Sequence, residues 1–393
     1  MPTTALPARF ICVHLLQTVP FANLNRDDTN SVKTVQFGGV LRTRVSSQCW
    51  KRAVRQDFEL RTGQSALRTR RIAERVARLL TEERGWDADL AARAGAHLAA
   101  AAGIKFELEE KDKKALPNVV LQNALVYVPE TAASELADIA EEFRTEIEKA
   151  KDITKSTDKS ALKDHSDRVK AVLRSRNGVI NTFGRMLAEV DDAGVDGAVQ
   201  VAHAMTTHPT DIEIDYFSAV DDVTDQWKDA TGSGHMGHAE FSAGTFYRYA
   251  TLDLAELAAN LGGDMAAVRE LAEAFVQSFV RSLPQAKKNS TAPNTPPDLV
   301  HVTVRADRPL SLAAAFEKPV RMAADGGFAA ASRDALAEYA EAVNEFMGKD
   351  GILLAGWAGL DAKDHAGLGE RHTSVDKLVT AAANRAFEKE AAA

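Results

Sequence analysis

The order of extended and helical segments constrains the fold of this chain more than any single motif does. Residues 9–18 (RFICVHLLQT) are rich in β-branched and apolar side chains, which predicts a buried strand. A helix is predicted to begin at Ser47, its expected N-cap, and Trp50, Val54 and Phe58 recur along it at four-residue spacing. Because this spacing forms one apolar stripe, we expect the helix to pack on the strand.

Residues 61–176 differ in character from the segments on either side. They are rich in Arg, Ala and charged residues with helical periodicity, and only 121–128 (LQNALVYV) predicts a strand. This predicts a mostly helical insertion. Before it, residues 33–45 predict two short extended pieces on either side of Gly38–Gly39.

The second half of the chain predicts strands with a protruding loop between them, then a helix and a further strand. Strands are predicted at 198–207, 244–254, 298–305 and 351–360, helices at 264–283, 333–347 and 373–389, and loops at 208–242 and 284–297. The loop at 208–242 is acidic and Gly-rich, typical of an exposed loop or hairpin. The whole order predicts an α+β fold, with a βαββαβ ferredoxin-like core that carries large insertions.

Composition narrows the class of protein. No run approaches the roughly 18 apolar residues of a membrane span, and no charged region followed by an apolar block suggests a signal peptide. Cys12 and Cys49 do not make a disulfide framework, so a reducing cytoplasm is expected. The net charge of −8 argues against indiscriminate nucleic-acid binding but leaves room for a local basic groove.

One acid-free basic stretch stands out against this acidic background. No carboxylate occurs between Asp28 and Asp57, whereas six cations do: Lys33, Arg42, Arg44, Lys51, Arg52 and Arg55. Cations in the first turns of a helix are unfavourable by roughly 0.3–1 kcal/mol each, unless an external anion sits there. The pattern therefore favours a phosphate site, with Ser46, Ser47 and Gln48 as further donors and Arg42 and Arg44 on one face of the preceding strand. A solvated basic helix face remains the alternative.

Other candidate sites carry weaker signals. His235 and His238 could bind a metal only with further ligands, and the carboxylates at 211, 213 and 215 fail the calcium-loop pattern. Asp27 and Asp28 could hold Mg²⁺ or act as a base, although a loop turn is the simpler interpretation. Lys287, Lys288 and Asn289 could touch phosphate. We predict no metal, no cofactor and no catalytic residue.

Standard catalytic and nucleotide-binding motifs are absent, and aromatic residues make up only 6% of the chain. If the core binds RNA, it should therefore hold the backbone more than it stacks on bases.

Residues 23–55 (NLNRDDTNSVKTVQFGGVLRTRVSSQCWKRAVR) strongly resemble the CasC family, the RAMP-like backbone subunit of the type I-E CRISPR surveillance complex Cascade. Further motifs of that family follow in order: FGRMLAE (183–189), HAMTTH (203–208), EIDYFSAVDD (213–222), FYRYATLDL (246–254), NTPPDLVHVTVR (294–305) and SLAAAFEKPV (311–320). The resemblance spans almost the entire chain.

The resemblance implies a hand-shaped protein. Its palm would be a modified ferredoxin-like (RRM-like) fold built from 1–60, 177–205 and 243–393, its fingers the helical insertion 61–176, and its thumb a hairpin at 206–242. Copies would stack head to tail along one CRISPR RNA and present its bases to target DNA in antiviral defence. The implied partners are CRISPR RNA, the target DNA strand, other copies of the chain and other Cascade subunits, with no membrane.

Residues carried over from the family fall on the sites already noted. The implied RNA contacts are Ser46, Ser47, Gln48, Lys51 and Arg55, with Lys287 and Lys288 beside the RNA track, and the basic stretch and motif add Arg42, Arg44, Arg52 and Asn289. The implied thumb residues are Thr206, Thr207, Tyr216, Phe217 and Met236, and the acidic Asp221, Asp222 and Asp225 are expected to position a neighbouring copy.

Two other interpretations stay open. A metal-dependent ribonuclease of a related CRISPR effector type would use Asp27 or Asp28. An α+β protein with an incidental anion-binding helix would bind no RNA at all.

Overall fold

The computed structural model describes residues 7–109, 118–121, 125–153, 155, 158–219 and 235–388. The chain divides into two compact units. Unit 1 comprises Met1–Phe58, Val199–Ala258 and Gly263–Ala393, and unit 2 comprises Glu59–Ala198 and Ala259–Gly262. The predicted CasC-like thumb tip, including Asp221, Asp222 and Asp225, lies outside the described residues.

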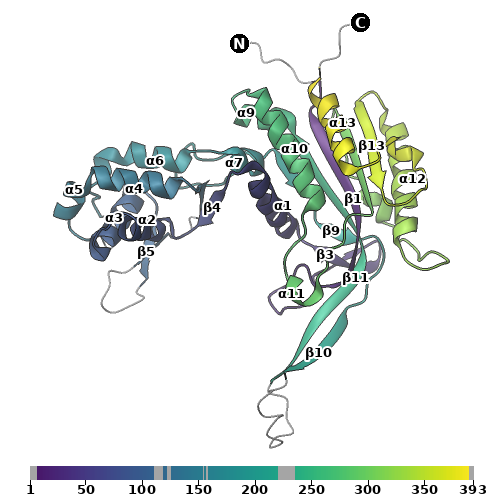
Figure 1. The fold of residues 1–393 in the computed structure, drawn as a ribbon, viewed down its shortest axis with the longest axis horizontal. Helices are drawn as coiled ribbons and strands as arrows, with labels where there is room; N and C mark the ends of the chain where they lie inside the picture. Colours follow the sequence, from purple (N-terminus) through teal and green to yellow (C-terminus); the bar gives the residue numbers. More distant parts are fainter. Residues whose placement is uncertain are drawn as a thin grey trace, which may run out of the picture. The chain divides into compact units, whose positions relative to one another are not determined.

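Unit 1 is built on one large sheet (Figure 1). Its strand order is β14 (Glu370–Arg371), β13 (Ile352–Gly359), β12 (Leu299–Arg305), β1 (Phe10–Ala22), β11 (His235–Asp253), β9 (Ala204–Thr206), β3 (Val40–Val45) and β2 (Thr34–Phe37), while β8 (Val199–Val201) and β10 (Glu213–Ala219) pair with β11. Neighbours are antiparallel except β13 and β14. The mixed α+β class is therefore confirmed.

Strand β1 forms the centre of this sheet. It pairs with β11 on one side and β12 on the other, and its residues from Phe10 to Gln17 are all buried. The predicted strand at 9–18 is thus confirmed and runs on to Ala22. Its register with β11 shifts between Val19 and Ala22, around Pro20, which has no N–H for a regular ladder.

A two-residue turn at Gly38–Gly39 joins β2 and β3, as the sequence predicts. Phe37 pairs with Val40, and φ is +61° at Gly38 and +78° at Gly39, a combination that favours glycine at both positions. A Cβ on Gly38 would stand 1.7 Å from the carbonyl oxygen of Glu317. The turn therefore packs against the chain at Glu317, and a larger residue at Gly38 would displace it.

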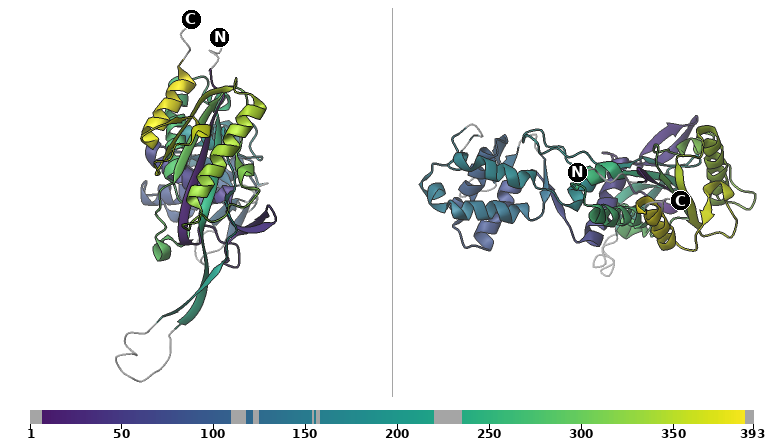
Figure 2. Two further views of the ribbon diagram at one scale, coloured as in Figure 1. Left: turned by 90° about the vertical axis from the view of Figure 1, so that its right-hand side faces the viewer. Right: turned by 90° about the horizontal axis from the view of Figure 1, so that it is seen from above.

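Helices cover both faces of the sheet in unit 1. The helices of unit 1 are α10 (Met265–Arg281), α11 (Lys288–Thr291), α12 (Ala329–Met347) and α13 (Val375–Phe387), with 3-10 turns η2 (Ala313–Phe316) and η3 (Ala366–Leu368). Most of α1 (Ser47–Thr62) and α9 (Leu254–Asn260) also belongs to unit 1, and the last residues of both belong to unit 2. On one face α12 buries Leu336 in a cluster with Leu16 and Trp357. On the opposite face, α10 and α13 pack against the strands (Figure 2). The predicted helices at 264–283, 333–347 and 373–389 are confirmed.

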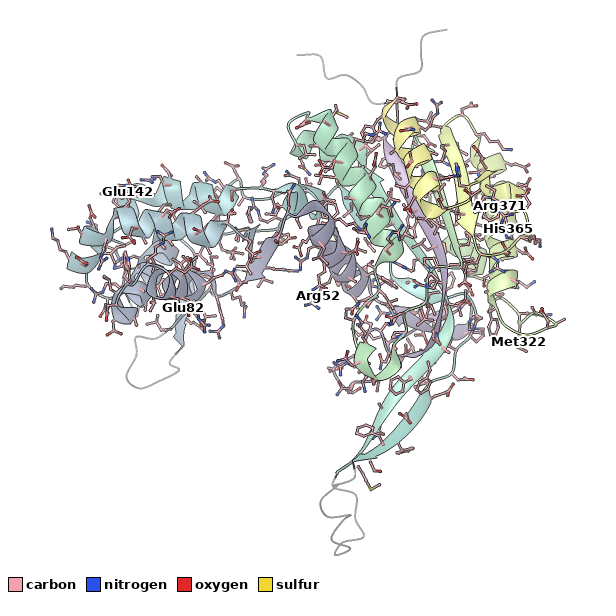
Figure 3. The ribbon with its side chains drawn as sticks, in the orientation of Figure 1. Arg52, Glu82, Glu142, Met322, His365 and Arg371 are labelled. Carbon is pink, nitrogen blue, oxygen red and sulfur yellow. The ribbon has the colours of Figure 1, made fainter. Side chains whose placement is uncertain are left out.

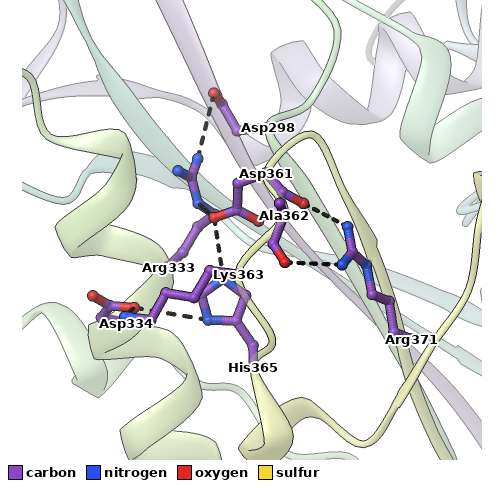
Figure 4. A network of polar contacts seen from close by, with 8 residues as sticks. All are labelled: Asp298, Arg333, Asp334, Asp361, Ala362, Lys363, His365 and Arg371. Atoms are coloured by element: carbon purple, nitrogen blue, oxygen red, sulfur yellow. Dashed lines mark hydrogen bonds and ion pairs between the residues drawn. The ribbon is translucent and has the colours of Figure 1, made fainter.

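A network of ion pairs fixes the loop after β13 to α12 (Figure 4). Arg333 Nε lies 2.7 Å from Asp361 Oδ2, and Asp298 is a more distant partner at 4.0 Å. His365 Nε2 lies 3.3 Å from Asp361 Oδ2, and Lys363 pairs with Asp334. The chain thereby ties the start of β12, helix α12 and the loop together.

Unit 2 is mostly helical with two short ribbons. Its elements are α2 (Ile72–Glu82), α3 (Ala88–Ala101), α4 (Ala132–Glu142), α5 (Arg144–Lys149), α6 (Ser166–Arg174), α7 (Gly178–Phe183) and the turn η1 (Lys163–His165), with strand pairs β4 (Ala66–Thr69) with β7 (Val126–Pro129) and β5 (Phe106–Glu109) with β6 (Asn118–Leu121). Val76, Leu80 and Leu98 lie in one apolar core cluster of this unit.

Three sequence predictions need correction. The single strand expected at 121–128 is two strands, β6 and β7, because each pairs with a different partner. The segment expected at 198–207 is likewise split into β8 and β9. The loop at 284–297 contains the one-turn helix α11, where hydroxyl groups of Ser290 and Thr291 bond to the Lys287 carbonyl oxygen.

Candidate nucleic-acid interface

Helix α1 begins with a local cap that differs from the predicted one. Ser46 Oγ accepts a hydrogen bond from Cys49 N at 3.3 Å, and the Ser46 carbonyl oxygen accepts from Trp50 N. Ser46 is therefore the N-cap instead of Ser47. The stripe of Trp50, Val54 and Phe58 is buried as predicted, which turns the other faces of the first turns outward.

His203, in the connection between β8 and β9, lies over the same helix start. Its Nδ1 lies 3.1 Å from Ser47 N and 3.2 Å from Arg44 Nη1. The contact places Arg44, at the end of β3, beside the first turn of α1. Burial and the Arg44 charge lower the pKa of His203, so the ring is neutral at neutral pH.

Arg42 does not extend this basic surface, contrary to the prediction. Its side chain is fully buried, and its guanidinium donates to the carbonyl oxygens of Phe37, Thr206 and Phe316. Burial lowers its pKa. Arg42 and Arg44 do share one face of β3, but the chain near Phe316 covers Arg42 and leaves Arg44 accessible.

The predicted RNA-contact residues on α1 differ in how exposed their side chains are. Gln48 and Arg52 are exposed, and the Arg52 side chain projects from α1 (Figure 3). Lys51 is half-buried, its Nζ donates to the Val199 carbonyl oxygen at 3.4 Å, and desolvation lowers its pKa. Arg55 is half-buried as well. In the part of the chain that the structure describes, no carboxylate pairs with Arg44, Lys51 or Arg52, so their charge is available to an anion.

The loop between β1 and β2 holds the helix start in place. Asn25 Oδ1 accepts from Ser46 N at 2.9 Å. Asp27 Oδ1 accepts from Thr29 N, from the Thr29 hydroxyl and from Ser31 N, and these bonds lower the Asp27 pKa, with the Thr29 hydroxyl the largest cause. Asp27 is thus a loop-capping residue, in agreement with the turn interpretation.

The hairpin of β10 and β11 carries exposed apolar side chains. Tyr216 is 78% exposed and Met236 76% exposed, with Ile214 on the same face of β10 as Tyr216. Phe217 lies on the other face. β10 and the first part of β11 pair antiparallel within the loop or hairpin that the sequence predicts at 208–242. The thumb role of Tyr216, Phe217 and Met236 stays a prediction.

Thr206 and Thr207 need correction, because both are buried in the sheet and not on this hairpin. The Thr206 hydroxyl donates to the His208 carbonyl oxygen, and Thr207 Oγ1 lies 2.8 Å from Ser332 Oγ. Their side chains are therefore part of the core of unit 1.

The basic motif at 287–289 forms the start of α11. Lys288 and Asn289 are exposed, whereas the Lys287 ammonium lies over the ring of Phe241, 5.3 Å from its centroid. Lys287 has φ +53°, a left-handed conformation that is uncommon outside glycine. The Phe241 ring in turn packs on Phe21 at 4.4 Å, so the motif sits at the base of the hairpin.

The sequence interpretation missed three residues of the site. His203 and Asn25 complete the hydrogen bonding of the α1 start. Glu240, on β11 at the base of the hairpin, accepts from Val32 N and links the hairpin to the β1–β2 loop. His203 and Glu240 lie far from α1 in sequence, so no local pattern could connect them to it.

Metal and membrane features are lacking in what the structure describes. Among those residues, no group of three or more His, Cys, Asp or Glu side chains could hold a metal ion. None of the helices found there is long and apolar enough to cross a membrane.

A family model and solved structures each match nearly the whole chain. The family described as CT1975-like protein matches residues 11–381. A solved chain from a "CRISPR RNA-guided surveillance complex, pre-nicking" is 44% identical, with a TM-score of 0.86, and the match covers 96% of this chain and all of that one. Another, from a "CRISPR RNA-guided surveillance complex", is 39% identical, with a TM-score of 0.75 and coverage of 95% and 99%. No curated protein matches.

Proposed function

Because the chain belongs to the CT1975-like protein family and is homologous to subunits of CRISPR RNA-guided surveillance complexes, we propose that it is the CRISPR-RNA-binding backbone subunit of a type I-E Cascade. In this role it is a non-enzymatic scaffold of the cytoplasm. It binds CRISPR RNA and other Cascade subunits, and it leaves the guide bases free to pair with target DNA.

The strand order of unit 1 supports a ferredoxin-like palm. The central strands run β12, β1, β11, β9, each antiparallel to its neighbour. Along the chain, helix α1 lies between β1 and β9, after β2 and β3 and before most of unit 2. Helix α10 lies between β11 and β12. Two strand–helix–strand units interleaved in this way are the ferredoxin-like pattern, which many RNA-binding proteins use.

The start of α1 carries the proposal. It has a positive helix end, cations without carboxylate partners in the described chain at Arg44, Lys51 and Arg52, and the exposed amide of Gln48. These groups can bind phosphates along a strand without reading its bases. A backbone-holding mode is what a guide RNA needs, because its Watson–Crick edges must remain free for the target.

The β10–β11 hairpin supports contact with further molecules. A two-stranded ribbon is marginally stable by itself, and this one exposes Ile214, Tyr216 and Met236. We propose that it serves as the thumb, inserting at the RNA and contacting the next copy. Such contacts join unlike surfaces, which lets copies assemble head to tail along the RNA. The array stays open where the rotation between neighbouring copies does not close into a ring.

A salt series tests the proposed RNA site. Binding of a CRISPR-repeat RNA would be measured for the wild type, for Lys51→Gln/Arg52→Gln, and for Arg144→Gln/Arg168→Gln. The last variant removes two charges of unit 2, each paired with a glutamate at the surface. Each phosphate contact on a single strand contributes about 0.7 to the slope of log K against log salt. We expect the first variant to lose about 1.4 of slope. The control should keep the wild-type slope, and equal losses in both variants would overturn the assignment.

Assembly is measured on the same samples. Native mass spectrometry should detect several copies of the wild type on one RNA. A single copy per RNA at saturating protein would exclude the head-to-tail scaffold while leaving RNA binding intact.

A further inference from the structure

His203 has one ring nitrogen in use and one that is free. Nδ1 faces Ser47 N at 3.1 Å and Arg44 Nη1 at 3.2 Å. The ring is exposed, and Nε2 has no hydrogen-bond partner among the residues that the structure describes. The second nitrogen is therefore accessible at the surface next to the start of α1.

The two neighbours of Nδ1 determine where the ring proton lies. A backbone N–H and a guanidinium can only donate, so Nδ1 must offer its lone pair to them. In a neutral imidazole the single proton is then on Nε2. The helix start thereby fixes the tautomer and gives the outer nitrogen an N–H.

We infer that the Nε2–H of His203 is a hydrogen-bond donor to a phosphate or ribose oxygen of the strand bound at the start of α1. This inference rests on the proposed function. It adds His203 to the RNA contacts, which neither the basic stretch nor the family resemblance does. Arg44 supplies charge at the same place, whereas His203 supplies a neutral, directed donor. The two side chains touch, so they can bind one strand together.

The chemistry of the site explains why a neutral ring serves here. A proton on Nδ1 would point at two donors, Ser47 N–H and the Arg44 guanidinium, and break both contacts. A neutral donor also releases no counterion when it meets a phosphate. Loss of this contact should therefore lower RNA affinity by the same factor at every salt concentration.

Two amide substitutions separate the two nitrogens. In His203→Asn the side-chain oxygen can replace Nδ1 as acceptor, while the outer donor is lost. In His203→Gln the longer side chain can place an N–H near the Nε2 position, while the acceptor for Ser47 is lost. His203→Ala removes both functions. The wild type and the three variants would be compared for RNA affinity across a salt series and for melting temperature.

We expect His203→Asn to melt like the wild type and to bind RNA about ten-fold more weakly, as one hydrogen bond to a charged acceptor implies. His203→Gln should bind more tightly than His203→Ala. The salt slope should stay at the wild-type value in all three variants.

Contrary outcomes are distinct. Wild-type affinity in His203→Asn, with weakening only in His203→Gln and His203→Ala, would reduce His203 to a helix cap and overturn the inference. No RNA binding by the wild type would instead reject the proposed function. Binding of an all-2′-deoxy strand separates the two acceptors. An equal loss on RNA and on the deoxy strand assigns the contact to phosphate, and a loss on RNA alone assigns it to the 2′-hydroxyl.

Discussion

The ring of Phe217 lies over Gly237 on the neighbouring strand of the hairpin, so closely that a Cβ on Gly237 would stand 2.5 Å from Phe217 Cζ. Glycine is weak in a strand because it has no side chain to pack. Here the Phe217 ring on β10 fills the space that a side chain of residue 237 on β11 would take. The Phe217 ring thus packs across the strand pair on the backbone of Gly237.

Gly237→Val should displace the Phe217 ring and loosen the hairpin. We expect amide exchange in β10 to speed up several-fold, while exchange in β1 is unchanged, because the substitution lies outside the sheet core. Exchange measured by mass spectrometry checks both. Ser218→Val adds similar bulk at an exposed position of β10 and should leave β10 protection as it is. Equal loss of β10 protection in both variants would show that the packing of Phe217 on Gly237 does not stabilise the hairpin.

We expect two buried histidines to make the stability of unit 1 sensitive to acid. His14 and His301 face each other across β1 and β12, with ring centroids 5.3 Å apart. Burial lowers the pKa of both, and that of His301 falls to about 4. The unfolded chain, with His near 6.5, then binds more protons than the folded one between about pH 6.5 and pH 4.

Stability from His301 is therefore fully present above about pH 6.5 and is lost as the pH falls toward 4, by about 3 kcal/mol in total. Urea unfolding monitored through exchange of β1 amides at about pH 7 and about pH 5 measures the loss. In His301→Gln the group cannot titrate, and the difference between the two pH values should shrink. An unchanged difference would assign the acid sensitivity to other groups.

Arg333→Met should destabilise unit 1 by about 3 kcal/mol, because it leaves the poorly exposed Asp361 carboxylate without its closest cation. Lys363→Met removes the same charge from an ion pair whose lysine is 61% exposed, and it should cost less than about 1 kcal/mol. Urea unfolding of the two variants gives the comparison. Similar costs would mean that the network is solvated in solution.

Asp27 offers a test of the enzymatic alternative. With its carboxylate oxygen bonded to Thr29 and Ser31, Asp27 is expected to support the loop and not to cleave RNA. Incubation of labelled RNA with the wild type and Mg²⁺ should yield no products. Products that disappear in Asp27→Ala or Asp28→Ala would establish a ribonuclease and refute the scaffold.

Periodicity predicted the parts of the fold that depend on local pattern. The stripe of Trp50, Val54 and Phe58 identified α1 because helical spacing alone brings these residues onto one face. Spacing also placed Arg42 and Arg44 on one face of β3. It could not indicate that Phe316, far along the chain, lies over one arginine and not the other.

Long-range contacts explain two other differences between the predicted and the observed structure, at the N-cap of α1 and at residues 121–128. The sequence cannot distinguish Ser46 from Ser47 as N-cap, because both are serines. In the structure Ser46 Oγ accepts from Cys49 N, while Ser46 N donates to Asn25 Oδ1 and Ser47 N to His203 Nδ1. The division of 121–128 into two strands depends on partners at Phe106–Glu109 and Ala66–Thr69. No window of sequence around these positions contains that information.

The central position of β1 has a consequence for synthesis on the ribosome. Phe10 pairs with Asp253 and Arg305, so the strand made first cannot complete its ladders until more than three-quarters of the chain has been translated. At 5–20 residues per second that is a wait of roughly 15–60 s. Unit 2, nearly continuous from Glu59 to Ala198, can fold in the meantime. During the interval an apolar strand with two open edges needs protection, so we expect β1 to be exposed to aggregation and to chaperone binding in the nascent protein.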